Sequence, residues 1–478
     1  MFGHGIYHST EKPIFFQGKG QQLSNTLLNY KEIIIQYRQG YVVIHLDSFR
    51  KVFMRHKNSQ GIAYSVFPFG SSRQMFLVGE PEEQYTCQND IQGQERTIPD
   101  YPKQVRNLLE NVKNVCEKEG FSENVIGMWH FFLADIGMQQ LVQQLADEMF
   151  PNSFGAKTYV PQAPASGAVI ALELWTMCGD VNHFEIDFGL NDSASGKSAV
   201  AKFDKMRWFF GGGYQPYRYS FGAYERSADA FSGMHSLLKE HEFELDQVLR
   251  TWIYQGHLLQ PEGGTQRYKE LNRARTDFFG KTRFLQDYLP KGYKGRAYPA
   301  STGIGADALP NEQGDVVISA VALDTKRKDV IAVPLENPNQ TSAFDYGEVY
   351  SPQSPKFSRA MAVAVDDTCL IFVSGTASIT DSESRHIGAP VKQTEQTLDN
   401  IAALITGENL ERHGISDFVC SLENLECVRV YVKRQSELEV IRQVCERRLP
   451  EVPTIYTVAD VCRPELLVEI EGVAIARR

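Results

Sequence analysis

The chain has 478 residues, of which 42% are hydrophobic and 23% charged, and its formal net charge is −10 at pH 7. This length suits about three domains of ~150 residues with the composition of an ordinary globular protein. The acidic balance argues against a dedicated nucleic-acid-binding protein, and no apolar run reaches the ~18 residues of a membrane-spanning helix. Because residues 1–19 also lack the basic and then apolar order of a signal peptide, we expect a cytoplasmic protein.

The predicted elements begin with an amphipathic helix near residue 105, and the pattern that follows it occurs three times. Residues 101–175, 221–320 and 391–475 each run helix, strand, helix and closing strand. The first helices place apolar residues three, four and seven apart, which puts them on one helical face. These apolar positions are Val105, Leu108, Leu109, Val112 and Val115 in the first copy, Phe231, Met234, Leu237 and Leu238 in the second, and Val391, Leu398, Ile401, Leu404 and Ile405 in the third.

Short runs of β-branched and aromatic residues follow the first helices and predict strands. A second helix and a closing strand complete each copy, and hairpin strands precede the first helix, as at residues 363–379. In chain order, the elements after the first helices are strand 123–132, helix 137–149 and strand 168–175; strand 245–254, helix 266–279 and strand 315–323; and strand 424–432, helix 436–449 and strand 466–475.

Each copy is therefore expected to be a β-sheet with two helices on one face. The sequence predicts an α+β protein of three tandem units, which we place at residues 1–185, 186–335 and 336–478. Two linkers separate them: segment 177–198, which is rich in glycine, serine and aspartate, and segment 334–355, which holds four prolines.

We expect neither a metal nor a cofactor. The eight cysteines occur singly, without a CxxC pair or a regular spacing, which is typical of reduced structural thiols. Ser195–Ser198 resembles the end of a phosphate-binding P-loop, but Asn191 stands where that motif needs glycine. Gly211–Gly213 has no helix directly after it, which favours a flexible turn before Tyr214.

Two segments of the third copy carry a family resemblance. Pro453–Ala476 and Val373–Ile379 resemble the YjgF/RidA family, whose members are also called endoribonuclease L-PSP or translation initiation inhibitor. The resemblance implies a chorismate-mutase-like unit that forms homotrimers with ligand sites between subunits. Because three such units lie in one chain, we expect an intramolecular pseudo-trimer, as a monomer or a weak homo-oligomer, that binds a small-molecule carboxylate.

A narrower resemblance covers residues 205–478. Five segments follow one another in the order found in chorismatases and 3-hydroxybenzoate synthase-like proteins, which implies cleavage of chorismate into pyruvate and a cyclohexadiene diol or a hydroxybenzoate. Since the second linker holds part of this match, we expect it to lie across the active site. The segments are Leu249–Tyr254, Gln266–Asn272, Arg296–Gly305, Glu336–Tyr346 and Ser354–Ala360.

Chorismate has two carboxylates, a ring hydroxyl and an enol ether. A site for it should contain arginines that pair with the carboxylates, aromatic side chains for the ring, and one proton donor. The segments that carry the resemblances contain the residues that we predict to bind the substrate: Arg250, Trp252, Tyr254, Arg267, Tyr298, Tyr346, Arg359, Thr376, Ser378, Arg429 and Tyr431.

The predicted proton donor is a glutamate on the last strand. Glu469 and Glu471 are two residues apart, so both point to the same face of a strand. Two like charges raise one of the two pKa values, which keeps that carboxyl protonated at neutral pH. The carboxyl would protonate the methylene carbon of the enol ether, water would attack the oxocarbenium-like centre, and the hemiketal would collapse to pyruvate. By resemblance, Glu469 is the first choice for this general acid and Glu471 the second.

Each of these motifs also has a simpler structural explanation. Arg250, Trp252 and Tyr254 share one strand face and would suit an exposed or interface stripe. The glutamate pair would suit a solvated or salt-bridged edge strand, and Gly375–Ser378 a hairpin bend where only small residues fit.

Two other functional hypotheses remain. One is a non-catalytic or regulatory YjgF-type binder of a carboxylic metabolite, and the other is a YjgF/RidA-type deaminase. The deaminases rely on an arginine before the closing strand, where this chain has Ile455 in the third copy and Lys157 in the first, which disfavours imine hydrolysis. The first copy keeps Glu173 on its closing strand without a recognisable set of arginines and aromatic residues around it, so we expect this copy only to complete the ring.

Overall fold

The computed structural model describes residues 4–7, 14–16, 32–37, 40–45, 56–59, 61–82, 85–89, 95–123, 126–153, 155–179, 185–188, 198–216, 222–307, 316–347 and 353–478. The chain divides into two compact units, Met1–Arg55 and His56–Arg478. The smaller unit contains an antiparallel sheet in the order β2 (Ile14–Phe16), β1 (His4–Tyr7), β3 (Glu32–Tyr37), β4 (Gly40–His45). None of the helices in the described residues is long and apolar enough to cross a membrane.

Three six-stranded sheets form the larger unit, and they share one strand order. In each sheet, three antiparallel strands are followed in space by the closing strand and then by two parallel strands. A helix connects the two parallel strands along the chain, because a short hairpin cannot join strands that run in the same direction. In spatial order, the first sheet is β5 (His56–Ser59), β6 (Ile62–Phe69), β7 (Ser72–Gly79), β12 (Ile170–Cys178), β10 (Ile126–Leu133), β11 (Ala156–Val160). The second sheet is β13 (Glu185–Phe188), β14 (Ser198–Phe203), β15 (Met206–Tyr214), β20 (Val316–Thr325), β16 (Val248–Gly256), β19 (Ala300–Ala306). The third sheet is β21 (Ile331–Leu335), β22 (Ala360–Val365), β23 (Thr368–Ala377), β28 (Val468–Arg477), β26 (Leu425–Val432), β27 (Thr454–Val458).

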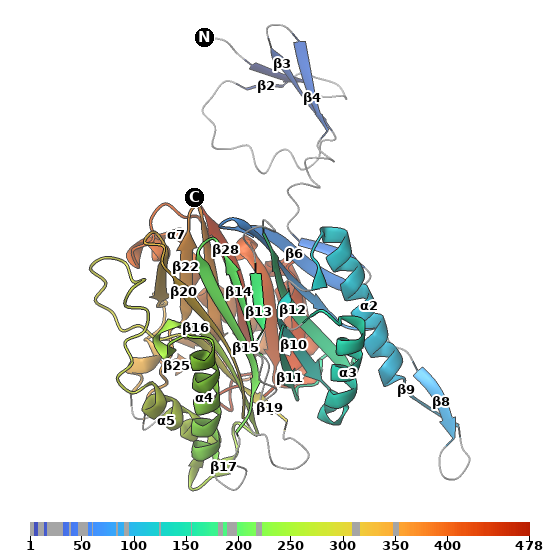
Figure 1. The fold of residues 1–478 in the computed structure, drawn as a ribbon, viewed down its shortest axis with the longest axis vertical. Coiled ribbons are helices and arrows are strands. Elements are labelled where there is room, and N and C mark those ends of the chain that lie inside the picture. Colours follow the sequence, from blue (N-terminus) through green and yellow to red (C-terminus); the bar gives the residue numbers. More distant parts are fainter. Residues whose placement is uncertain are drawn as a thin grey trace. The chain divides into compact units, whose positions relative to one another are not determined.

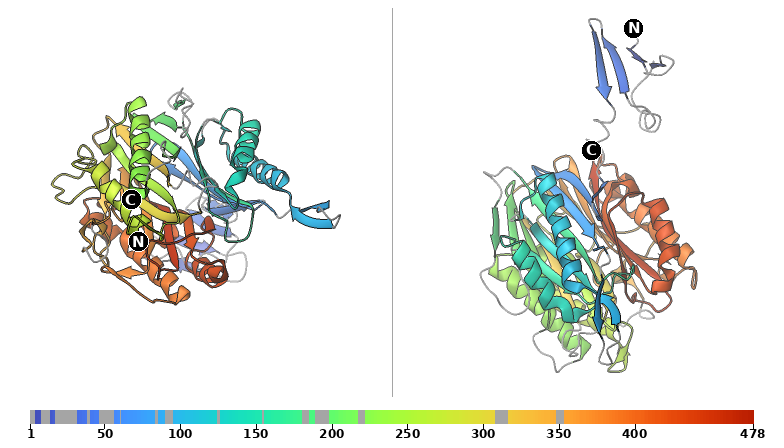
Figure 2. Two further views of the ribbon diagram at one scale, coloured as in Figure 1. Left: turned by 90° about the horizontal axis from the view of Figure 1, so that it is seen from below. Right: turned by 90° about the vertical axis from the view of Figure 1, so that its right-hand side faces the viewer.

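The sheets and their helices define three repeats, which run from β5 to β12, from β13 to β20 and from β21 to β28. The helices lie on the outside of the larger unit and the sheets lie inside (Figure 1), and a view along another axis shows one group of helices per repeat (Figure 2). The chain is thus a mixed α+β protein. The helices are α2 (Tyr101–Glu119), α3 (Gln139–Met149), α4 (Ala223–Glu240), α5 (Arg267–Phe279), α6 (Pro390–Ile405), α7 (Gly407–Arg412) and α8 (Leu438–Arg448).

Helix α2 shows how local sequence sets an element and its buried face. The Asp100 side chain accepts a hydrogen bond from Lys103 N at 3.2 Å, and the helix ends at Gly120 with φ of 75°. All of the apolar positions that the sequence placed on the inner face of α2 are buried, as are those of α4. The prediction was wrong for Val391, which lies in the first turn of α6 and is 43% exposed.

The inner faces of the three sheets meet in one apolar core. Trp175 of the first sheet packs against Phe210 of the second and Phe372 of the third, with ring centroids 5.0 and 5.8 Å apart. Burial of such large aromatic side chains is among the strongest stabilising contributions in a domain. The repeats therefore share a core and are not three independent domains on a string.

Two loop predictions differ from the structure. Gly211–Gly213 belongs to β15, with a bulge between Gly211 and Tyr214, and is not a turn. A Cβ on Gly212 would lie 2.6 Å from Thr158 Oγ1, so glycine allows β15 to approach β11 of the first repeat. The predicted first linker, segment 177–198, contains the end of β12 at Cys178 and strand β13 at residues 185–188. Within it, Ser195–Lys197 lie outside the described residues.

Candidate active site

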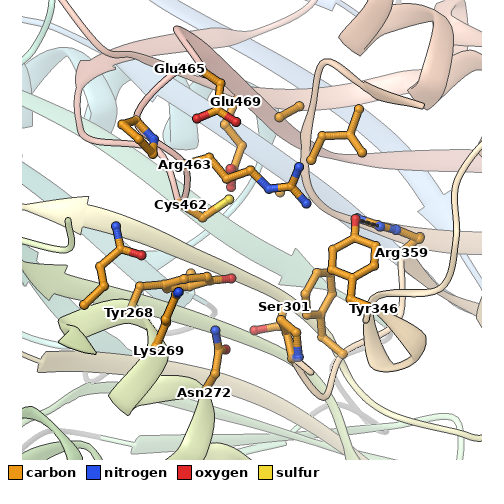
Figure 3. A pocket seen from close by; sticks show the side chains of 18 residues that line it. Tyr268, Lys269, Asn272, Ser301, Tyr346, Arg359, Cys462, Arg463, Glu465 and Glu469 are labelled. Carbon is orange, nitrogen blue, oxygen red and sulfur yellow. Dashed lines mark hydrogen bonds between the residues drawn. The ribbon is translucent and has the colours of Figure 1, made fainter. Parts of the chain in front are cut away.

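A cavity of about 460 Å³ lies between the second and third repeats. Helix α5 and strand β19 form one wall, and the opposite wall comes from the segment before β22, strand β23 and the loop that leads into β28 (Figure 3). The lining residues with polar or aromatic side chains are Gln266, Tyr268, Lys269, Asn272, Ser301, Tyr346, Phe357, Arg359, Cys462, Arg463, Glu465 and Glu469.

Backbone hydrogen bonds hold the two walls together. Ser358 N donates to Pro299 O at 3.1 Å, and Ser301 N donates to Ser374 Oγ at 2.9 Å. Gly375 N donates to the Thr302 hydroxyl at 2.9 Å. The edge of the second sheet is thus fixed against β23, which makes the cavity a preformed feature of the fold.

Glu469 is the acidic group of this cavity. Its side chain rests on Gly375, where an added Cβ would lie 2.1 Å from Glu469 Oε1. Burial and the nearby charge of Glu471 raise the pKa of Glu469 from 4.5 to about 8, although Arg359 and Arg250 act in the opposite direction. The carboxyl is therefore mostly protonated at neutral pH and can donate a proton into the cavity.

Glu471 lies two residues further along β28 in a different environment. Its Oε1 accepts hydrogen bonds from Trp252 Nε1 at 3.0 Å and Tyr431 OH at 2.9 Å. Its Oε2 accepts from the Arg250 guanidinium and the Thr302 hydroxyl. A carboxylate that is surrounded by donors acts as an acceptor, so Glu471 is suited to fixing its neighbours and not to donating a proton.

Arg429 joins the same buried network and links all three repeats. It pairs with Glu173 of the first repeat through two contacts of 2.6 Å, and its Nη1 lies 3.1 Å from Glu471. It also donates to Tyr254 OH at 2.8 Å and lies 3.0 Å from His130 Nδ1. The sequence shows no set of arginines and aromatic residues around Glu173, because its partner Arg429 comes from β26, 256 residues further along the chain.

The predicted substrate-binding residues fall into three groups. Tyr346 and Arg359 line the cavity together with Glu469. A second group forms the buried network around Glu471, behind the cavity: Arg250, Trp252, Tyr254, Arg429 and Tyr431. The three residues of the β16 stripe, Arg250, Trp252 and Tyr254, all belong to this buried network.

The third group lies away from the cavity lining. Thr376 donates to Ser374 O at 2.9 Å, because alternate residues of β23 face away from the lining residues Gly375 and Ala377. Ser378 follows the end of β23 and donates to Arg385 O at 3.2 Å. Arg267 pairs with Glu262 at 2.7 Å, and the Tyr298 ring packs on Phe344 at 5.4 Å. The second linker does reach the cavity, through Tyr346 and Pro355.

Several lining residues were missed. Tyr268, Lys269 and Asn272 lie within the matched segment Gln266–Asn272, but the choice of Arg267 there followed charge alone. Helical periodicity would have distinguished the lining residues from Arg267. Asn272 is four residues after Tyr268 and three after Lys269, so these three side chains share one face of the helix. Arg463 follows β27 in the Cys-Arg-Pro-Glu run of the closing segment and donates to Ser382 O at 2.9 Å.

Two named proteins are similar in sequence to this chain. The chain is 32% identical over 308 residues to a 3-hydroxybenzoate synthase from Streptomyces hygroscopicus, which covers 63% of this chain and 80% of that protein. It is 32% identical over 230 residues to a chorismatase from Streptomyces rapamycinicus, covering 47% of this chain and 63% of that protein. No protein-family model matches the chain.

A crystal structure of a chorismatase has the same fold. The TM-score is 0.55 at 22% identity, and the match covers 74% of this chain and 93% of the chorismatase chain. The sequence similarity and the shared fold lead to one conclusion: the chain belongs to the family of chorismatases and 3-hydroxybenzoate synthases and is an enzyme of the chorismatase type.

Proposed function

We propose that the enzyme cleaves the enolpyruvyl ether of chorismate, or of a closely related cyclic carboxylate, and releases pyruvate. The observation that carries this proposal is a buried carboxyl, Glu469, whose pKa is raised to about 8 by burial and by Glu471, in a cavity that also contains Arg359, Arg463 and Lys269. An acid that keeps its proton at neutral pH beside cationic side chains is what protonation of an anionic enol ether requires.

The cavity suits a small cyclic dianion in size and chemistry. Its volume of about 460 Å³ falls within the range of ~300–1,000 Å³ for small-molecule sites. Arg359 and Arg463 offer planar guanidinium groups for two carboxylates, and Tyr268 and Tyr346 offer aromatic surface and hydroxyls. The two arginines approach from the third repeat, whereas Tyr268 lies on the opposite wall (Figure 3).

The proposed reaction begins at the methylene carbon. Glu469 gives its proton to that carbon, which becomes a methyl group and leaves an oxocarbenium centre at the ether carbon. Water adds to this centre and loses a proton to the Glu469 carboxylate, which regenerates the acid. The hemiketal then breaks its bond to the ring oxygen, which takes up the hydroxyl proton, and the products are pyruvate and a ring diol. Formation of a hydroxybenzoate instead releases pyruvate without the net addition of water.

Glu471 has a supporting role in this scheme. Its charge favours the protonated form of Glu469, and its bonds to Arg250 and Thr302 keep that charge in place. We assign Glu471 to positioning and Glu469 to proton transfer.

We also propose that the three repeats form an intramolecular pseudo-trimer and that the enzyme acts as a single chain. The shared strand order, the common aromatic core and the Arg429–Glu173 pair between the third and first repeats support this arrangement. Light scattering on the purified protein should give the mass of one chain; a stable trimer would contradict the proposal.

The decisive experiment is incubation of the purified enzyme with chorismate and detection of pyruvate. We expect pyruvate from the wild type and a loss of about 10²–10⁴-fold in kcat for Glu469→Gln, because the general acid is removed without a change in size. Glu408→Gln is the matched control, since that side chain is 74% exposed on α7. Mass spectrometry of the second product separates diol from hydroxybenzoate, which differ by one water.

Absence of pyruvate from the wild type would contradict the proposed function. Unchanged turnover in Glu469→Gln would contradict the assignment of the general acid while leaving the reaction itself in place.

A further inference from the structure

We infer that Glu336 is a positioning residue that sets the charge around Arg359 and thereby controls how tightly the cavity holds the carboxylates of its substrate. The inference rests on the proposed function for the identity of the ligand. Glu336 does not line the cavity and lies directly behind a residue that does.

Glu336 and Arg359 flank the end of a strand pair. Strand β21 pairs antiparallel with β22, and its last pair is Leu335 with Ala360, so Glu336 and Arg359 each lie one residue beyond that pair. The charge of each residue acts on the pKa of the other, which shows that the two side chains lie near one another. Arg359 extends from this point into the cavity wall.

Several polar groups between these residues are buried without a hydrogen-bond partner. Among the described residues, none lies within bonding geometry of either Glu336 carboxyl oxygen, of Arg359 Nε or of the Ser358 hydroxyl. The Ser342 and Ser358 hydroxyls and the backbone N–H of Arg359 face the Glu336 carboxyl closely enough to lower its pKa. Acceptors and donors thus lie near one another behind the binding wall.

Hydrogen bonds hold the backbone of Glu336 in place. Its backbone N–H donates to His413 Nε2 at 3.1 Å, and its carbonyl accepts from Asn409 Nδ2 at 3.2 Å. The next residue, Asn337, donates from its side chain to Asn400 O at 2.7 Å. These bonds attach the segment to α6 and α7, so the carboxyl remains buried beside Arg359.

Arg359 is held on its cavity side by other groups. Its Nη2 donates to Thr341 O at 3.0 Å and to Tyr346 OH at 2.5 Å. The guanidinium also lies 5.6 Å from the Phe357 ring centroid. Its orientation is therefore fixed without Glu336, and what Glu336 can change is the electrostatic field that an incoming carboxylate experiences.

Burial raises the pKa of Glu336 from 4.5 to about 7, against the opposing influence of Arg359 and of the nearby hydrogen-bond donors. The other titratable groups that face it are Tyr293, whose pKa it helps to raise, and His413, whose pKa is lowered by burial. Below pH 7, Glu336 is neutral and Arg359 keeps its full attraction for an anion. Above pH 7, the ionised carboxylate offsets part of that attraction.

The test measures chorismate binding without turnover. In a Glu469→Gln background, which also removes the titration of Glu469, we expect the Kd for chorismate to rise roughly three- to tenfold between about pH 6 and about pH 8. Adding Glu336→Gln should abolish this rise, whereas adding the exposed control Glu408→Gln should leave it unchanged. The same rise in both Glu336 forms would overturn the inference.

A measurement without ligand separates this inference from the proposed function. The folded-state pKa of Glu336 lies above its value in the unfolded chain, so the wild type should lose thermal stability relative to Glu336→Gln as pH rises from about 4.5 to about 7. A stability difference that does not change with pH overturns the inference whether or not chorismate binds. If chorismate does not bind but stability changes with pH as expected, the proposed function is contradicted. The raised pKa of Glu336 is then still supported.

Discussion

At the residue scale, one strand contains two glutamates with different chemistry. Glu469 and Glu471 have the same side chain and face the same side of β28, yet one faces a cavity and the other is surrounded by hydrogen-bond donors. The sequence could place them on one face and predict that one pKa is raised. Only the fold shows that Glu469 rests on Gly375 in the cavity while Glu471 is hydrogen-bonded to Thr302 and Arg250, all three of which come from other strands.

The raised pKa of Glu469 gives the enzyme a defined pH dependence. Because the protonated form is the active one, kcat should be level at neutral pH and fall as pH rises through about 8. The pKa of the folded state is above that of the unfolded chain, so stability should also fall between about pH 4.5 and pH 8. Thermal unfolding of wild type and Glu469→Gln across this range should show the two proteins diverging, and parallel curves would contradict the shift.

At the scale of elements, the contact between β19 and β23 positions the acid. Gly375 has an ordinary backbone conformation, so glycine is needed there for space and not for φ. The Thr302 hydroxyl accepts from Gly375 N and from Arg250 and donates to Glu471, which connects the cavity wall to the buried network. A short segment of β23 therefore fixes both the position and the surroundings of Glu469.

Substitution Gly375→Ala should displace the Glu469 carboxyl, because the new Cβ would lie 2.1 Å from its Oε1. We expect kcat to fall about tenfold or more, while thermal stability changes little because the side chain can turn into the cavity. The control is Gly233→Ala on helix α4, where a Cβ meets no atom within 4 Å of the described structure. That variant should keep full activity and gain up to ~1 kcal/mol of stability. Equal activity of both variants would contradict this role of Gly375.

At the scale of the whole molecule, a buried ionic network connects the three repeats. Arg250 comes from the second repeat, Arg429 and Glu471 from the third and Glu173 from the first, and two positive and two negative charges balance. A buried pair costs much desolvation, and its removal from one side leaves an uncompensated charge. The first repeat therefore contributes a specific partner to the network and does more than complete the ring.

Glu173→Gln should destabilise the protein by about 3–5 kcal/mol, because Arg429 would lose one of its two charged partners in a buried position and the network would keep an uncompensated positive charge. The matched control is Glu148→Gln, which removes the partner of Arg106 in a pair whose side chains are 45% and 55% exposed. That change should cost less than ~1 kcal/mol. Urea unfolding measures both values, and similar losses for the two variants would contradict the special role of the Glu173 pair.

Residues whose role depends on a local pattern could be predicted from the sequence, and residues whose role depends on distant partners could not. The helix faces of α2 and α4 followed from apolar spacing, because helical periodicity is local. Arg359, Tyr346 and Glu469 were found through matched segments. Tyr268 was missed although helical periodicity places it on one face with Asn272, and Arg463 was missed because no local pattern shows which way a loop side chain points. The Arg429–Glu173 pair could not be predicted from the sequence, because the two residues are 256 positions apart along the chain.

By itself, the sequence determined the repeated order of helices and strands, the α+β class and the segments that contain the site, because these depend on local periodicity and on short motifs. Only the tertiary structure decided that Arg250 and Arg429 serve the buried network while Arg359 faces the cavity. It also decided that Glu469 keeps its proton and Glu471 accepts hydrogen bonds. The physical reason is that the burial and the charged partners of these residues are set by contacts between strands of different repeats. Those contacts cannot be read from the separation of the strands along the chain.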